Sequence, residues 1–73
     1  MASILQIFGN NIRKMRLKRN ISQQELANIC DLHRTYIGIV ERAEKNITLL
    51  NAAKIAEGLD VELTFLLTET DDK

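Results

Sequence analysis

The chain has 73 residues, one cysteine, no proline and a formal net charge of zero. That length allows one domain with one small core, and a lone cysteine excludes an internal disulfide and fits a reducing cytoplasm. No apolar run approaches the roughly 18 residues of a membrane span, and the N-terminus lacks the basic segment of a signal peptide. We therefore expect residues 1–73 to form a single cytoplasmic domain built from helices.

The charges are distributed unevenly along the chain. Residues 1–48 hold eight Lys or Arg against four Asp or Glu, whereas residues 49–73 hold two against six. The two parts therefore carry formal charges of +4 and −4. A molecule polarised in this way can present a basic face to a polyanion while its acidic end points away.

Ser3 and Gln6 have the spacing of a capping box, which predicts that a first helix begins after Ser3. Its apolar face consists of Leu5, Phe8, Ile12 and Met15. Asn20 can adopt the left-handed conformation that ends a helix. The first helix is therefore expected to stop before residue 20.

A stronger capping signal follows at residues 21–26. Ser22 and Glu25 form a capping box, and Ile21 and Leu26 have the positions of a hydrophobic staple. A second helix should therefore begin at Gln23. We expect the residues facing inward to be Leu26, Ile29 and Cys30.

A third helix is expected at about residues 33–42, after a turn in which Asp31 tolerates left-handed geometry. At 100° per residue, one half of this helix presents Arg34, Thr35, Gly38, Ile39 and Arg42. The other half presents Tyr36, Ile37, Val40 and Glu41. The pattern exposes two arginines and places one glutamate among apolar residues.

Thr48 is expected to cap a fourth helix that ends at Gly58. Its buried face should consist of Ala52, Ile55, Ala56 and Leu59. A short fifth helix is expected at about residues 62–67, where Leu63, Leu66 and Leu67 would complete the core. Residues 68–73, TETDDK, have the composition of a frayed acidic tail.

Two short helices joined by a tight turn, the second with an exposed polar face, are typical of a helix-turn-helix. In that motif the second helix enters the major groove of DNA. The pattern IRKMRLKRNISQQELANICDLHRTYIGIVER…NITLLNAAKIAEGL resembles the lambda-repressor-like (XRE) DNA-binding domain. Within it, LHRTYIGIVERAEKNIT most resembles the controller proteins of restriction–modification systems.

The resemblance implies an all-α fold of five helices, with the helix-turn-helix formed by the second and third. It also implies a dimeric transcription regulator that binds a palindromic operator in double-stranded DNA and times expression of an endonuclease. Finally, it implies an ion pair between Arg16 and Glu41. A planar guanidinium can hold a carboxylate through two hydrogen bonds, which makes such a partly buried pair tolerable.

The expected DNA contacts combine this resemblance with the chemistry of the side chains. Arg34 is the expected base reader, because arginine commonly bridges O6 and N7 of guanine. Gly38 disfavours the helix by about 1 kcal/mol relative to alanine, but lets a backbone approach DNA. Further base or groove contacts are expected from Thr35, Tyr36 and Ile39, and phosphate contacts from Gln23, Gln24, Arg42 and Asn46.

The C-terminal part is expected to form the dimer contact. Val61, Phe65 and Thr68 lie opposite the core-facing side of the fifth helix, and Leu50 lies off the buried stripe of the fourth. A large aromatic side chain that faces outward on so small a domain indicates a covered surface. A two-fold contact there would place two copies of the third helix about one DNA turn apart, roughly 34 Å.

Other classes of function have less support in the sequence. A small phage-type repressor, an antitoxin and a protein-interaction module of the same fold remain alternatives. No glycine-rich phosphate loop, metal cluster or nucleophile–base pair indicates an enzyme. His33 and Cys30 are too few for a zinc site. We expect no metal, cofactor or small-molecule ligand.

Overall fold

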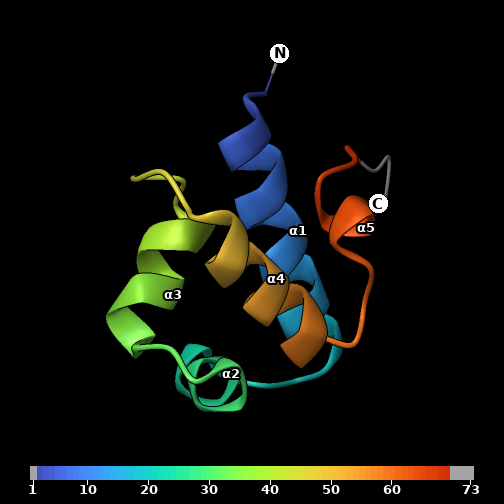
Figure 1. Cartoon of the computed structure of the whole chain (residues 1–73). Helices are drawn as coiled ribbons and strands as arrows, with labels where there is room; N and C mark the ends of the chain where they lie inside the picture. Colours follow the sequence, from blue (N-terminus) through green and yellow to red (C-terminus); the bar gives the residue numbers. More distant parts are fainter. Residues whose placement is uncertain (1, 70–73) are drawn as a thin grey trace.

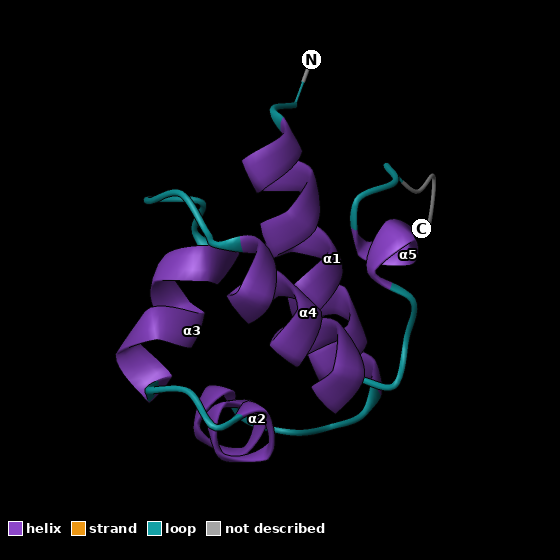
Figure 2. Cartoon of the chain, in the orientation of Figure 1, coloured by secondary structure: helices purple, strands orange, loops and turns teal. Residues whose placement is uncertain are grey.

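The structure is a computed structural model that describes residues 2–69, and in them the chain forms five helices and no strand (Figures 1 and 2). The helices are α1 (Ile4–Lys18), α2 (Gln23–Cys30), α3 (Arg34–Glu41), α4 (Leu49–Gly58) and α5 (Leu63–Leu66). The predicted all-α fold is confirmed. Residues 70–73 of the predicted acidic tail lie outside the described residues.

α4 packs on α2 and α5, and its ribbon overlaps that of α1 in the middle of Figure 1. The recognition candidate α3 packs on α1 and α2, whereas α5 packs on α1 and α4. α3 and α5 therefore lie on different sides of the molecule (Figure 1). None of the helices in the described part of the chain is long and apolar enough to cross a membrane.

The predicted helix starts are confirmed by their caps. Ser3 Oγ accepts from the Gln6 amide at 3.2 Å, and Gln6 Oε1 accepts from the Ser3 amide at 2.9 Å. Ser22 and Glu25 make the same reciprocal pair at 3.0 and 2.8 Å. Thr48 Oγ1 accepts from the amide of residue 51 at 3.1 Å. Local sequence alone therefore defines where α1, α2 and α4 begin.

The predicted helix ends are confirmed, although Gly58 serves a different purpose from the one expected. Asn20 and Asp31 adopt left-handed backbone conformations, with φ of 57° and 59°, as expected. α4 ends at Gly58, but the left-handed residue after it is Asp60, with φ of 58°. Gly58 is needed for a different reason, because a Cβ atom there would lie 2.6 Å from the sulfur of Cys30. The glycine therefore permits close packing of α4 on α2 and does not act as the cap.

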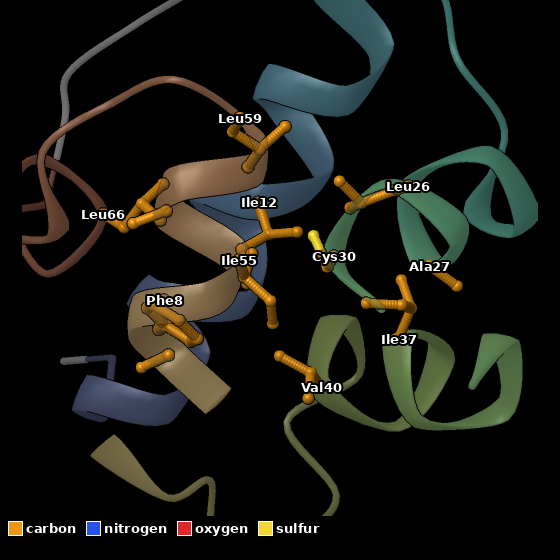
Figure 3. Packing of buried hydrophobic residues seen from close by; sticks show 12 residues of the cluster. Phe8, Ile12, Leu26, Ala27, Cys30, Ile37, Val40, Ile55, Leu59 and Leu66 are labelled. Atoms are coloured by element: carbon orange, nitrogen blue, oxygen red, sulfur yellow. The ribbon is translucent and has the colours of Figure 1, made fainter. Parts of the chain in front are cut away.

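All five helices contribute to one hydrophobic core (Figure 3). Its buried residues are Phe8, Ile12, Leu26, Ala27, Cys30, Ile37, Val40, Ala52, Ile55, Ala56, Leu59 and Leu66. Two predicted core positions are wrong: Ile29 is 56% exposed and Leu67 is 39% exposed. Ile29 lies about 100° from the centre of the face that Leu26, Ala27 and Cys30 form. Leu67 follows the last residue of α5 and so leaves its helical face.

Gly9 lets α1 and α3 approach at the level of the main chain. A Cβ atom at residue 9 would lie 2.5 Å from the carbonyl oxygen of Val40 and 2.8 Å from that of Glu41. Any side chain there would separate the two helices, because the atoms that it meets belong to backbone. The C-terminal end of α3 is thus seated directly on the backbone of α1.

Asn11 is the buried polar residue among those described, with 4% of its surface exposed. Its side-chain amide donates to the carbonyl oxygens of Leu66 and Thr68, both at 2.9 Å. These carbonyls lie at the end of α5, where no further helical turn can bond them. Asn11 therefore fixes α5 and the residues that follow it to α1.

Candidate nucleic-acid interface

The N-terminal turn of α3 holds Arg34 and Thr35 in solvent, while Ile37 and Val40 are buried beneath it. His33 caps this helix, and its Nδ1 atom accepts from the amide of Thr35 at 3.1 Å. Within residues 2–69, no hydrogen bond or ion pair engages the Arg34 guanidinium. The expected base reader is therefore presented on a fixed helix start with its donors unoccupied.

The predicted Arg16–Glu41 pair is confirmed, and it is bidentate. Arg16 Nε donates to Glu41 Oε2 at 2.7 Å, and Arg16 Nη2 donates to Glu41 Oε1 at 3.1 Å. The side chains are only 11% and 3% exposed, respectively. Arg16 Nη1 also donates to the carbonyl of Ile21 at 3.0 Å. Glu41 can be buried because the Arg16 guanidinium supplies its counter-charge, and the pair joins α3 to α1.

The start of α2 belongs to the same network. Gln23 Nε2 donates to Glu41 Oε1 at 3.1 Å, and Gln24 Nε2 donates to Asn28 Oδ1 at 3.0 Å. The Gln23 side chain therefore connects α2 to the end of α3. The backbone amides at the start of α2 form the positive end of the helix dipole, where a phosphate binds favourably. Phosphate contacts by Gln23 and Gln24 stay a prediction.

Arg42, at the other end of α3, makes a second bidentate ion pair that the sequence did not suggest. Its Nε and Nη2 atoms donate to Glu44 at 2.9 and 3.2 Å. The guanidinium also lies over Gly38, where a Cβ atom would be 3.0 Å from Arg42 Nη1. Gly38 is buried, so a DNA backbone can approach it only if Arg42 moves. The hydrogen bond lowers the pKa of Glu44 and raises the pKa of Arg42.

The middle of α3 is connected to α4. The Tyr36 hydroxyl accepts from Asn51 Nδ2 at 3.1 Å, and its ring packs against the core. The hydroxyl keeps its own hydrogen for donation to a phosphate or a base. Ile39 is half-buried beside it, and Asn46 is exposed in the loop between α3 and α4. Asn51 was missed by the sequence analysis, because nothing local distinguishes it from a solvated residue of the first turn.

The predicted dimer residues belong to α4, to α5 and to the segments on either side of α5. Leu50 is 67% exposed and Phe65 is 44% exposed. Val61 is half-buried against the core, and Thr68 is exposed, with its Oγ1 donating to the carbonyl of Thr64 at 2.7 Å. A shallow groove between the two helices is lined by Ala53, Ala56, Glu57, Asp60, Val61, Glu62 and Leu63.

Cys30 lies in the core, as predicted, and burial raises the pKa of its thiol. A buried thiol with a raised pKa is a poor nucleophile, because the thiolate is the reactive form. Among residues 2–69, no group of three or more His, Cys, Asp or Glu side chains is arranged to hold a metal ion.

Comparison with known proteins gives a consistent assignment. The helix-turn-helix family model matches residues 12–66. The chain is 46% identical over 69 residues to the control protein C.BamHI of Bacillus amyloliquefaciens, covering 93% of this chain and 85% of that protein.

Solved structures agree with the sequence match. The restriction–modification controller protein C.AhdI from Aeromonas hydrophila superimposes with a TM-score of 0.81 and 40% identity, over 85% of this chain and 94% of that one. The controller protein C.Esp1396I, solved as a tetramer on its natural 35 base-pair operator, gives a TM-score of 0.81 and 32% identity, over 90% and 87% of the two chains. Two variants of C.Esp1396I have also been solved, in which a threonine or the tyrosine that directly follows it is replaced. This chain belongs to the helix-turn-helix family, in the group that contains the restriction–modification controller proteins.

Proposed function

We propose that the protein is a dimeric, sequence-specific regulator of transcription that binds a palindromic operator, as a restriction–modification controller acting on its own promoter and that of the endonuclease. One observation carries the proposal: α3 presents Arg34 and Thr35 to solvent, while the buried Arg16–Glu41 pair fixes its other end. A reading helix needs this combination, because base contacts require side chains that a rigid scaffold holds in place.

In this proposal Arg34 reads a guanine, and Thr35 offers a hydroxyl and a methyl group to a neighbouring base pair. The single tyrosine of the chain, Tyr36, directly follows a threonine. Adjacent threonine and tyrosine residues were also the positions varied in C.Esp1396I. This parallel supports a DNA contact at the same place. Phosphate contacts come from Gln23, Gln24, Arg42 and Asn46, which flank the reading residues. Ile39 lies on the same face, and Gly38 lies beneath Arg42.

The proposed dimer uses Leu50, Val61, Phe65 and Thr68. α5 lies away from α3, so a two-fold contact through α5 leaves both reading helices uncovered (Figure 1). The solved tetramer of C.Esp1396I on its operator supports association of such chains on DNA.

The protein is further proposed to be a single domain over residues 1–73 that acts in the cytoplasm by binding alone, without catalysis, metal or cofactor.

Footprinting on the DNA upstream of the protein's own gene tests the proposed function. We expect protection of two related half-sites whose centres are separated by about one helical turn, roughly 10 base pairs, because two-fold symmetric proteins read two-fold symmetric sites. Only uniform, weak protection that disappears at moderate salt would contradict sequence-specific regulation, since that is the behaviour of non-specific binding.

Sedimentation of the wild type and of Phe65→Glu at micromolar concentration tests the dimer. We expect a dimer for the wild type and a monomer for Phe65→Glu, because a carboxylate at the centre of the contact would lose its water. Leu17→Glu is a matched control, since Leu17 is an exposed apolar side chain of α1, at 53% exposure. A monomeric wild type, or identical masses for wild type and Phe65→Glu, contradicts this contact.

A further inference from the structure

The loop that follows α3 holds Glu44 in a defined position. Ala43 is left-handed, with φ of 56°. Its amide donates to the carbonyl of Val40 at 3.1 Å, and the amide of Glu44 donates to that of Ile39 at 3.1 Å. This pair of hydrogen bonds is the Schellman closure of a helix end. The backbone of Glu44 is therefore fixed beside the last turn of α3, where the loop projects from the molecule (Figure 1).

Glu44 in turn fixes Arg42. The carboxylate occupies the Nε and one Nη2 donor of the guanidinium, at 2.9 and 3.2 Å. The remaining nitrogen, Nη1, lies back over Gly38 on the outward face of α3. The outward face thus carries two arginines in different states: Arg34 makes no such pair within residues 2–69, whereas Arg42 is held by a carboxylate.

The paired arginine attracts DNA less than a free one. Non-specific binding arises almost entirely from attraction between basic side chains and phosphates, and a neutral Arg42–Glu44 pair contributes little to it. The pair is nevertheless easily exchanged, because both side chains are more than half exposed, at 57% and 51%, and exposed pairs have low stability. A phosphate that the rest of the interface holds beside Arg42 can therefore replace Glu44.

We propose, on the basis of the proposed function, that Glu44 is a specificity determinant that suppresses non-specific DNA affinity by holding Arg42 in a neutral pair until a bound operator presents a phosphate to it. Arg42 would then be released for DNA only where Arg34 and the other reading residues are already engaged. Glu44 itself would contact no base.

The test compares wild type, Glu44→Gln, Arg42→Ala and the double variant. Each is titrated with the footprinted operator fragment and with a scrambled duplex of equal length, at several salt concentrations. Glu44→Gln should tighten binding to the scrambled duplex by about two- to fivefold at low salt. It should also steepen the salt slope by up to roughly 0.9, the value for one phosphate. Operator affinity should rise less, so the ratio of operator to scrambled affinity falls.

Two comparisons identify the cause of any change. In the Arg42→Ala background, Glu44→Gln should have almost no effect, because no guanidinium remains to be released. Glu57→Gln, which removes the same charge from α4, should likewise leave the affinity ratio unchanged. Unchanged affinity and slope in Glu44→Gln overturn the proposal.

Two further outcomes also overturn it. An equal gain in the Arg42→Ala background would mean that Glu44 repels phosphate directly. Weaker operator binding in Glu44→Gln would mean that the carboxylate orients Arg42 for its contact. A wild type that protects no DNA upstream of its gene contradicts the proposed function itself, whereas a protecting wild type with an unaltered Glu44→Gln variant contradicts only the role of Glu44.

Discussion

Two arginine–glutamate pairs with nearly the same geometry lie at the C-terminal end of α3, and their environments differ. Arg16 and Glu41 meet at 2.7 and 3.1 Å, and Arg42 and Glu44 meet at 2.9 and 3.2 Å. The first pair is 11% and 3% exposed, whereas the second is 57% and 51% exposed. Hydrogen-bond geometry therefore does not distinguish them, and exposure to water does.

The difference shows how one chemical pair can serve two purposes. Removing one partner of a buried pair leaves a charge without water or counter-charge, so the pair stays formed in the folded protein. In an exposed pair, water or a phosphate can replace either partner at little cost. The buried pair therefore fixes the orientation of α3, and the exposed pair is suited to exchange during DNA binding.

The largest expected effect comes from breaking the buried pair. Arg16→Ala and Glu41→Ala should each reduce the free energy of unfolding by about 3–5 kcal/mol, because each leaves its partner charged and buried. Urea unfolding followed by circular dichroism measures this. Arg42→Ala and Glu44→Ala are the matched controls and should leave the unfolding midpoint almost unchanged. Values for Arg16→Ala and Glu41→Ala within about 0.5 kcal/mol of wild type would show that the first pair is effectively exposed.

Asn11 extends the comparison to a buried group without charge. Asn11→Ala should reduce the free energy of unfolding by about 1–3 kcal/mol, because the carbonyls of Leu66 and Thr68 lose their donor. Amide hydrogen exchange should show that the loss of protection is concentrated in α5. Asn10→Ala is the control, since Asn10 is the exposed neighbour on the same helix. Equal protection of α5 in both variants would contradict the role of Asn11.

Within residues 2–69, Arg34 at the start of α3 has no carboxylate partner, unlike Arg42 at the end of that helix. Arg34→Ala should reduce operator affinity by about 1–3 kcal/mol and relax the preference at one base pair. Gln23→Ala should weaken binding to all sequences similarly, because its predicted contact is to phosphate. Binding measured against operators substituted one base pair at a time separates the two. An unaltered base preference in Arg34→Ala would show that Arg34 does not read a base.

The smallest effect concerns the titration of Glu44. Its pKa in the folded protein lies below the ordinary value of 4.5, chiefly because of the hydrogen bond from Arg42. The stability that this group contributes is therefore complete above the unfolded-state pKa and is lost as the pH falls through the folded-state pKa. In an NMR titration, Arg42→Ala should move the pKa of Glu44 upward towards 4.5. An identical pKa in both proteins would show that the pair does not persist in solution.

Helix starts and the apolar stripe of α4 were predictable because they depend on residues within one turn of each other. Ser22 and Glu25 form their cap without any other helix. The Arg16–Glu41 pair joins residues 25 positions apart, and only the family resemblance indicated it. Local pattern cannot bring such distant residues together.

The positions that were wrong or missed depend on how the helices pack. Ile29 was assigned to the core because α2 has only eight residues, too few to define its inward face without its neighbours. Glu44 was missed because its place depends on the left-handed turn at Ala43, which few non-glycine residues adopt. Asn11 was not singled out, because its partners lie more than 50 residues further along the chain, at the end of α5.

The close approach at Gly9 has a consequence for retargeting this domain to new DNA sequences. Contacts between main-chain atoms of α1 and α3 set the orientation of the reading helix at this point. The carbonyl oxygen of Val40 lies 2.5 Å from the position that a Cβ atom of residue 9 would occupy. Main-chain contacts do not depend on which side chains α3 carries on its other face. Libraries that vary residues 34 and 35 should therefore keep the helix in one pose, provided that Gly9 is left unaltered, so selected changes in binding can be attributed to base contacts.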